Sequence, residues 1–114
     1  MLRWTAMGEG KVNWRAYFKR FAELCPDVPV HIETISGFNR EMPYLQEEFW
    51  KVWPKARARD FARFLALAKK GKPRDPWKPL DGQDRKLAEQ QYQKGEIERS
   101  LHYCKTQLGL GLKP

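Results

Sequence analysis

The sequence contains little cysteine and little histidine, with two residues of each type among 114. Cys25 and Cys104 lie far apart, and neither belongs to a Cys-x-x-Cys pair or to a histidine cluster. Structural zinc sites combine several such ligands at short spacings. The sequence therefore argues against a structural zinc site. We expect both cysteines to stay reduced among packed helices, because free cysteine behaves as a small apolar side chain.

Long apolar runs are also missing. No run approaches the roughly 20 residues that span a bilayer, and residues 1–5 lack the basic segment and apolar stretch of a secretory signal. These absences predict a cytoplasmic protein with no membrane partner. Hydrophobic residues still make up 41% of the chain, which is enough for one folded domain of this length.

Positive charge is the strongest bulk feature, with a formal net charge of +8 and a pI near 9.7. Lysine and arginine neutralise phosphates, so a polyanion such as nucleic acid is one explanation. The cations, however, occur in several segments, and many alternate with glutamate or aromatic residues as on solvated helix faces. We therefore expect an ordinary basic exterior and do not expect nucleic acid as a partner.

The first residues predict a strand end, a glycine loop and a helix. Residues 2–7 are partly apolar and lead into Gly8–Gly10, where the two glycines permit a tight turn. Asn13 can cap a helix that ends near Leu24 or Cys25. Its aromatic residues recur at spacings of three and four, which gives one apolar helix face.

A strand is predicted next, from Val28 to Ile35, because apolar and polar residues alternate there. Val28, Val30 and Ile32 share one face of this strand. Glu33 lies near its C-terminal end and on the opposite face.

The rest of the chain predicts loops and helices. We expect a loop over residues 36–44, a short aromatic-rich helix ended by Pro54, and a longer helix over 55–70 closed by Gly71. Residues 72–82 are rich in proline, glycine and charge and predict a connector, which Trp77 anchors to the core. Two helices then follow, over 84–94 and 96–108, with Gly95 between them and Gly109 as a C-cap.

The stretch from Met7 to Trp14, the helix after it, and the strand Val28–Glu33 together resemble the last repeat of xylose-isomerase-like sugar phosphate isomerases and epimerases. In that family a Gly-x-Gly loop after the seventh strand leads into a helix, and the eighth strand carries a glutamate. The resemblance covers roughly the first third of the chain, and the helix over 55–70 would follow as the eighth helix of the barrel.

This resemblance implies an α/β fold: the last one or two β/α units of a (β/α)8 barrel in residues 1–71, followed by a linker and helical extension in 72–114. A complete barrel needs about 250 residues. The chain therefore implies a fragment, or a relic that pairs with the remainder of the barrel or with a neighbouring subunit, and we expect it to be inactive alone.

The resemblance also implies a site. Glu33 corresponds to the glutamate that ligates a divalent metal (Mn, Mg, Co or Zn) and exchanges a proton with a sugar or polyol substrate. Gly8, Glu9 and Gly10 would lie near the substrate, and Phe38 would cover the sugar ring. The family's other metal ligands, on earlier strands, have no counterparts in this chain, so Glu33 alone cannot hold the ion.

Other interpretations remain open at this point. A solvent-facing carboxylate on an edge strand is the ordinary fate of a residue such as Glu33. His31 is more simply a packed residue than a metal ligand, and the tryptophans Trp50 and Trp53 are more simply core residues than a sugar-binding wall. The same barrel superfamily contains endonuclease IV-type phosphodiesterases, and a small basic interaction module is a non-enzymatic alternative.

Overall fold

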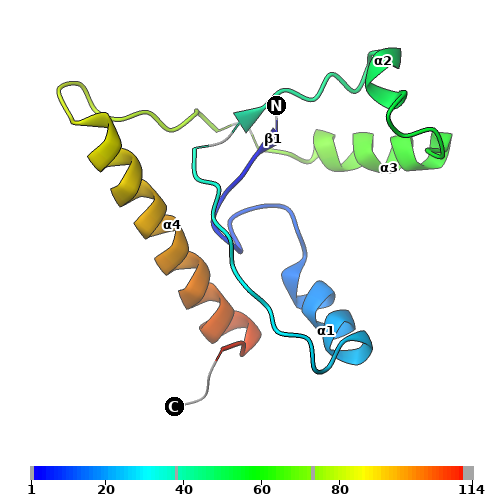
Figure 1. Ribbon diagram of the computed structural model, residues 1–114. Coiled ribbons are helices and arrows are strands. Elements are labelled where there is room, and N and C mark those ends of the chain that lie inside the picture. Colours follow the sequence, from blue (N-terminus) through cyan, green and yellow to red (C-terminus); the bar gives the residue numbers. More distant parts are fainter. Residues whose placement is uncertain (1, 38, 73, 112–114) are drawn as a thin grey trace. The chain divides into compact units, whose positions relative to one another are not determined.

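The computed structural model describes residues 2–37, 39–72 and 74–111. Within these ranges the chain forms four helices and one two-stranded sheet (Figure 1). By its internal contacts it divides into two compact units: the first unit is Met1–Arg3 with Asn39–Pro76, and the second unit is Trp4–Phe38 with Trp77–Pro114. The boundaries of these units do not coincide with those of the predicted segments 1–71 and 72–114. The roles of those segments as barrel units and extension stay a prediction.

The first unit holds the sheet and two helices. Strands β1 (Leu2–Arg3) and β2 (Asn39–Arg40) pair antiparallel, with Leu2 opposite Arg40. The short helix α2 spans Glu47–Trp50 and the helix α3 spans Ala58–Lys69. The predicted aromatic helix before Pro54 and the predicted helix over 55–70 are both present with shorter bounds.

An aromatic cluster joins α2 to α3. The Trp50 ring meets the rings of Phe61 and Phe64 edge-to-face, with centroids 5.5 and 6.3 Å apart. Its indole Nε1–H donates a hydrogen bond of 2.7 Å to the backbone oxygen of Tyr44. The Tyr44 ring in turn packs against Phe64, with ring centroids 5.3 Å apart. Trp50 is therefore a packed residue with a satisfied N–H, as buried tryptophans usually are.

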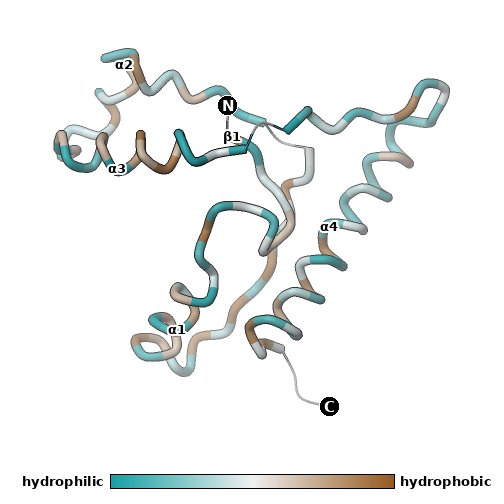
Figure 2. The backbone as a smooth tube through the Cα atoms, turned by 180° about the vertical axis from the view of Figure 1, so that it is seen from behind, coloured by the Kyte–Doolittle hydropathy of each residue, from teal (hydrophilic) through white to brown (hydrophobic). Residues whose placement is uncertain are grey.

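In the second unit, helix α1 spans Trp14–Leu24 and begins where the sequence predicts. The Asn13 side-chain oxygen accepts a hydrogen bond of 3.1 Å from the backbone N–H of Ala16, which is the N-cap interaction expected of asparagine. Aromatic residues cluster along one side of the helix, in contact with one another. Figure 2 shows brown apolar and teal polar positions alternating around its turns.

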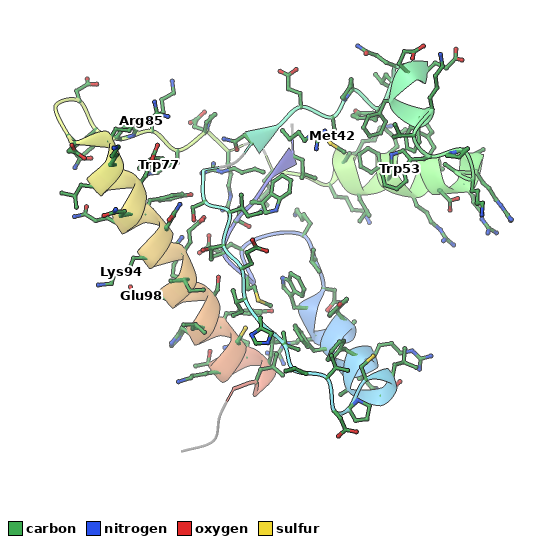
Figure 3. The ribbon with its side chains drawn as sticks, in the orientation of Figure 1. Met42, Trp53, Trp77, Arg85, Lys94 and Glu98 are labelled. Carbon is green, nitrogen blue, oxygen red and sulfur yellow. The ribbon has the colours of Figure 1, made fainter. Side chains whose placement is uncertain are left out.

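Helix α4 is continuous from Arg85 to Leu108, so the predicted break at Gly95 is wrong. One internal glycine costs a helix only about 1 kcal/mol, and α4 is well closed at both ends. Asp84 accepts from the N–H of Leu87 at 2.8 Å, and Gly109 is the predicted left-handed C-cap with φ +66°. The ion pair between Lys94 and Glu98, at 3.8 Å, spans the glycine on the outside of the helix (Figure 3).

The predicted strand over residues 28–35 is not assigned as a strand in the structure, where the segment has no regular secondary structure. At its start the backbone N–H of Val28 donates a 3.3 Å hydrogen bond to the backbone oxygen of Cys25, and no backbone–backbone hydrogen bond of residues 29–35 is seen within the described residues. A strand requires a neighbouring strand to complete its backbone hydrogen bonds. The alternating pattern alone could not reveal that such a neighbour is missing from the part of the chain that the structure describes.

The second unit has a very small core. Its fully buried apolar residues are Ala6, Ala88 and Cys104, with Glu96 and Ser100 buried beside them. Val28 and Val30, in contrast, are 54% and 48% exposed. Of the ranges that the structure covers, none contains a helix long and apolar enough to cross a membrane.

Candidate functional site

The Gly8–Gly10 loop is fixed against α4. Gly8 has φ +88°, a left-handed conformation that favours glycine. A Cβ built on it would lie 2.9 Å from Cγ of Tyr103 and closer still to two further carbons of that ring. The backbone of Gly8 thus lies against the tyrosine face, and glycine is required for both conformation and space.

A buried serine holds the start of this loop. The backbone N–H of Met7 donates a 3.0 Å hydrogen bond to Oγ of Ser100, and that hydroxyl donates at 2.8 Å to the backbone oxygen of Glu96. Ser100 is only 1% exposed. The Sγ of Cys104, one turn further along α4, lies 3.5 Å from Sδ of Met7. Burial raises the pKa of the Cys104 thiol.

Glu9 forms an ion pair with α4. Its Oε1 accepts a 2.7 Å hydrogen bond from Nε of Arg99. This hydrogen bond raises the pKa of the Arg99 guanidinium. Glu9 is therefore engaged within the chain, and its predicted contact with substrate stays a prediction.

An open hollow of about 580 Å³ lies beside the loop. Its lining combines loop residues with the exposed side of α4, including His102 and Tyr103. The predicted substrate-binding residues Gly8 and Glu9 line it, and Glu33 does not.

Glu33 and His31 are exposed on the irregular segment that follows α1. Within the described ranges, no group of three histidine, cysteine, aspartate or glutamate side chains could hold a metal ion. The described residues of this chain thus do not form a divalent-metal site among themselves. Phe38, the predicted cover of the sugar ring, lies outside the described residues.

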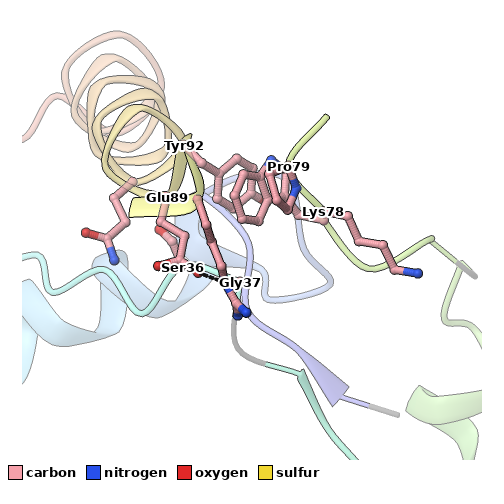
Figure 4. A pocket seen from close by; sticks show the side chains of 9 residues that line it. Ser36, Gly37, Lys78, Pro79, Glu89 and Tyr92 are labelled. Atoms are coloured by element: carbon pink, nitrogen blue, oxygen red, sulfur yellow. Dashed lines mark hydrogen bonds and ion pairs between the residues drawn. The ribbon is translucent and has the colours of Figure 1, made fainter. Parts of the chain in front are cut away.

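A second hollow, of about 540 Å³, is drawn in Figure 4, and Trp77 is one of the residues that line it. The indole stacks on the ring of Tyr92, with centroids 4.7 Å apart and planes 17° from parallel. Gly37, with φ +71°, lies beside the same indole, and a Cβ at that position would be 3.9 Å from its Cε3, an ordinary contact. Trp77 thus anchors the connector to α4, as its place in a proline-rich stretch predicts.

The charged side chains that line this hollow either form an ion pair with each other or point away from Tyr92. Arg85 donates to Glu89 at 2.9 Å, and in Figure 4 the Lys78 side chain extends away from Tyr92. The Oγ of Ser36 is buried, with no hydrogen-bond partner among the described residues. The hollow is therefore mainly the place where Trp77 packs on α4.

No protein-family model matches this chain, and neither a curated protein nor a solved structure matches it. Function must therefore be inferred from the residues themselves.

Two contacts of the site were not predicted from sequence. The Glu9–Arg99 pair and the Met7–Ser100 hydrogen bond join residues 90 and 93 positions apart. No local pattern indicates such pairs. A small polar residue at position 100, within the apolar spacing of Ile97, Leu101 and Cys104, is the only local sign that a polar partner packs there.

Proposed function

We propose that this chain supplies the last strand and helix units of a metal-dependent sugar or sugar phosphate isomerase or epimerase in the cytoplasm, and that it is inactive without the rest of the barrel. The observation that supports this proposal concerns residues 28–35. This segment has an alternating apolar pattern but no strand partner among the described residues. Backbone groups that find no backbone partner among the described residues are expected in a strand whose neighbours lie elsewhere.

The exposed apolar side chains support the same proposal. Val28 and Val30, on the aliphatic face of the predicted strand, are each close to half exposed, although β-branched residues in this alternation ordinarily pack against other elements. Neighbouring strands and helices of a barrel would cover them. The partner is thus the remainder of the barrel, supplied by a further part of the polypeptide or by a neighbouring subunit.

The role that we propose for Glu33 follows from this placement of residues 28–35. In a parallel barrel the functional side chains lie at the C-terminal ends of the strands, and Glu33 occupies that end of residues 28–35. The resemblance gives it the role of one carboxylate ligand to a divalent ion (Mn, Mg, Co or Zn), with proton exchange at a carbon next to a carbonyl as its second role. The other ligands would come from the rest of the barrel.

The test replaces Glu33 by glutamine in the assembled barrel, formed by this chain together with the polypeptide that supplies the other strands. We expect turnover of a small sugar or polyol to fall at least about a hundredfold and the bound metal, measured by mass spectrometry, to fall with it, because a ligand is lost. Glu41→Gln is the matched control, since Glu41 is also exposed but lies in the first unit.

Unchanged metal content and unchanged turnover in Glu33→Gln would contradict the proposal. Cleavage of DNA phosphodiester bonds, lost in Glu33→Gln, would instead favour the endonuclease IV-type alternative. The 114-residue chain alone should bind no divalent ion tightly, which calorimetry with Mn²⁺ measures directly.

A further inference from the structure

The positive charge of this protein is concentrated in residues 55–74. These 20 residues contain eight lysines and arginines and one acidic residue, Asp60, a formal charge of +7. The other 94 of the 114 residues contain the remaining 14 cations and 13 acidic residues, a net +1. The cations of this stretch are Lys55, Arg57, Arg59, Arg63, Lys69, Lys70, Lys72 and Arg74. The cations themselves occur in several segments, as expected, but outside residues 55–74 they are nearly balanced by acidic residues.

Helix α3 and its C-cap residue Lys70, whose backbone is still in the right-handed helical region, align three of these cations on one face. Arg59, Arg63 and Lys70 are spaced by four and seven residues, and at 100° per residue such positions point in nearly the same direction. Phe61 and Phe64 point the opposite way and pack against Trp50. We call Arg59, Arg63 and Lys70 the α3 basic row; it extends about 16 Å along the helix, from the rise of 1.5 Å per residue.

The α3 basic row is open to a partner. All three residues are exposed. Arg59 has only a loose contact with the Asp60 carboxylate, at 3.9 Å, and the Asp60 carboxylate also accepts a 3.0 Å hydrogen bond from the backbone N–H of Arg57. Neither Arg63 nor Lys70 has a carboxylate partner within the part of the chain that the structure describes.

We propose that the α3 basic row binds the phosphate backbone of a nucleic-acid duplex. A duplex strand presents one phosphate per 3.4 Å of axis, so a row of about 16 Å faces several phosphates. Arginine guanidinium groups pair well with phosphate oxygens. The row itself carries no aromatic side chain for stacking on unpaired bases, which favours a duplex over a single strand. This binding is independent of sequence and does not rest on the proposed enzymatic function.

A membrane surface fits the structure less well. Membrane-surface helices insert an apolar face next to their basic face, but in α3 Phe61 and Phe64 already contact the Trp50 ring of α2. Leu67 is the only large apolar side chain of α3 that is largely exposed, at 60%. Val52 and Trp53, which precede the helix, are also exposed, so lipid vesicles belong in the test as a competing outcome.

The experiment measures binding of the full 114-residue chain to a fluorescent 20-base-pair DNA duplex of mixed sequence by anisotropy, at several salt concentrations. The test variant is Arg59→Gln/Arg63→Gln/Lys70→Gln. The control variant is Lys86→Gln/Lys94→Gln/Lys105→Gln, which loses the same net charge from exposed positions on α4. Circular dichroism first establishes that both variants keep the helical content of the parent.

We expect the parent chain to bind with a steep salt dependence. The test variant should bind about tenfold or more weakly at low salt, and its slope of log K against log salt should be shallower by about 2 to 3, since each duplex phosphate contact contributes about 0.9. The control variant should keep most of the affinity and the slope.

Equal losses in the two variants would overturn the proposal, because net charge and not the row would then explain binding. Absence of binding by the parent chain at low salt would also overturn it. So would a test variant that loses binding to vesicles containing phosphatidylserine while its DNA binding is unchanged.

Discussion

Replacing Gly8 by alanine tests how firmly the glycine loop is fixed against α4. Gly8 has φ +88°, and a left-handed conformation costs a residue with a Cβ roughly 1–2 kcal/mol. The new methyl group would also collide with the half-buried Tyr103 ring, whose Cγ lies 2.9 Å from the Cβ position. Overpacking of this kind costs roughly a further 1–3 kcal/mol.

Gly82 provides the matched control. It has φ +79°, but a Cβ built there meets nothing within 4 Å. Gly82→Ala should therefore lower the free energy of unfolding by about 1–2 kcal/mol through backbone strain alone. Gly8→Ala should lower it by about 2–5 kcal/mol, the sum of strain and collision.

Urea unfolding followed by far-UV circular dichroism measures both values. A double-mutant cycle separates the collision from the strain: in a Tyr103→Ala background the ring is absent, so Gly8→Ala should cost no more than Gly82→Ala. The reasoning is refuted if Gly8→Ala costs the same with and without the Tyr103 ring, or if the two glycine substitutions are equally destabilising in the parent chain.

Two further predictions concern the buried side of α4. Ser100→Ala leaves the N–H of Met7 without its partner and should cost about 1–3 kcal/mol in the same unfolding assay; Thr106→Ala, which removes an exposed hydroxyl bonded to His102 at 2.9 Å, should cost much less. If both cost the same, the Ser100 bridge is not stabilising. Because burial raises the pKa of the Cys104 thiol, the folded chain retains this proton to a higher pH than the unfolded chain. The resulting stability is complete below the unfolded pKa of about 8.5 and is lost as pH rises through the folded value. The parent chain should therefore lose more stability than Cys104→Ala between pH 8 and pH 10, with Cys25→Ala as control; parallel losses would contradict this.

Sequence reasoning succeeded where the determining interaction is local. The Asn13 cap bonds a residue three positions away, and Gly109 closes α4 through its own φ of +66°. Both follow from residue type and neighbouring spacing. The aromatic spacing of α1 and the end of α3 just before Gly71 belong to the same class.

Sequence reasoning failed where the structure depends on contacts between distant parts of the chain. The alternation over residues 28–35 predicts a strand, but a strand forms only if a second segment supplies hydrogen bonds. Gly95 was expected to interrupt a helix, yet the residues buried on either side, Ala88 and Glu96, keep the helix intact. The basic row is a different case, because a charge count in a window of 20 residues would have located it.

The two proposals can be separated because their residues belong to different compact units. Glu33 lies in the second unit, whereas Arg59, Arg63 and Lys70 lie in the first. Glu33→Gln should therefore leave the salt slope of duplex binding unchanged, and the triple substitution in α3 should leave turnover and bound metal unchanged in the assembled barrel. A loss of both properties from either substitution would mean that one surface serves substrate and polyanion alike, and the two proposals would then have to be replaced by one.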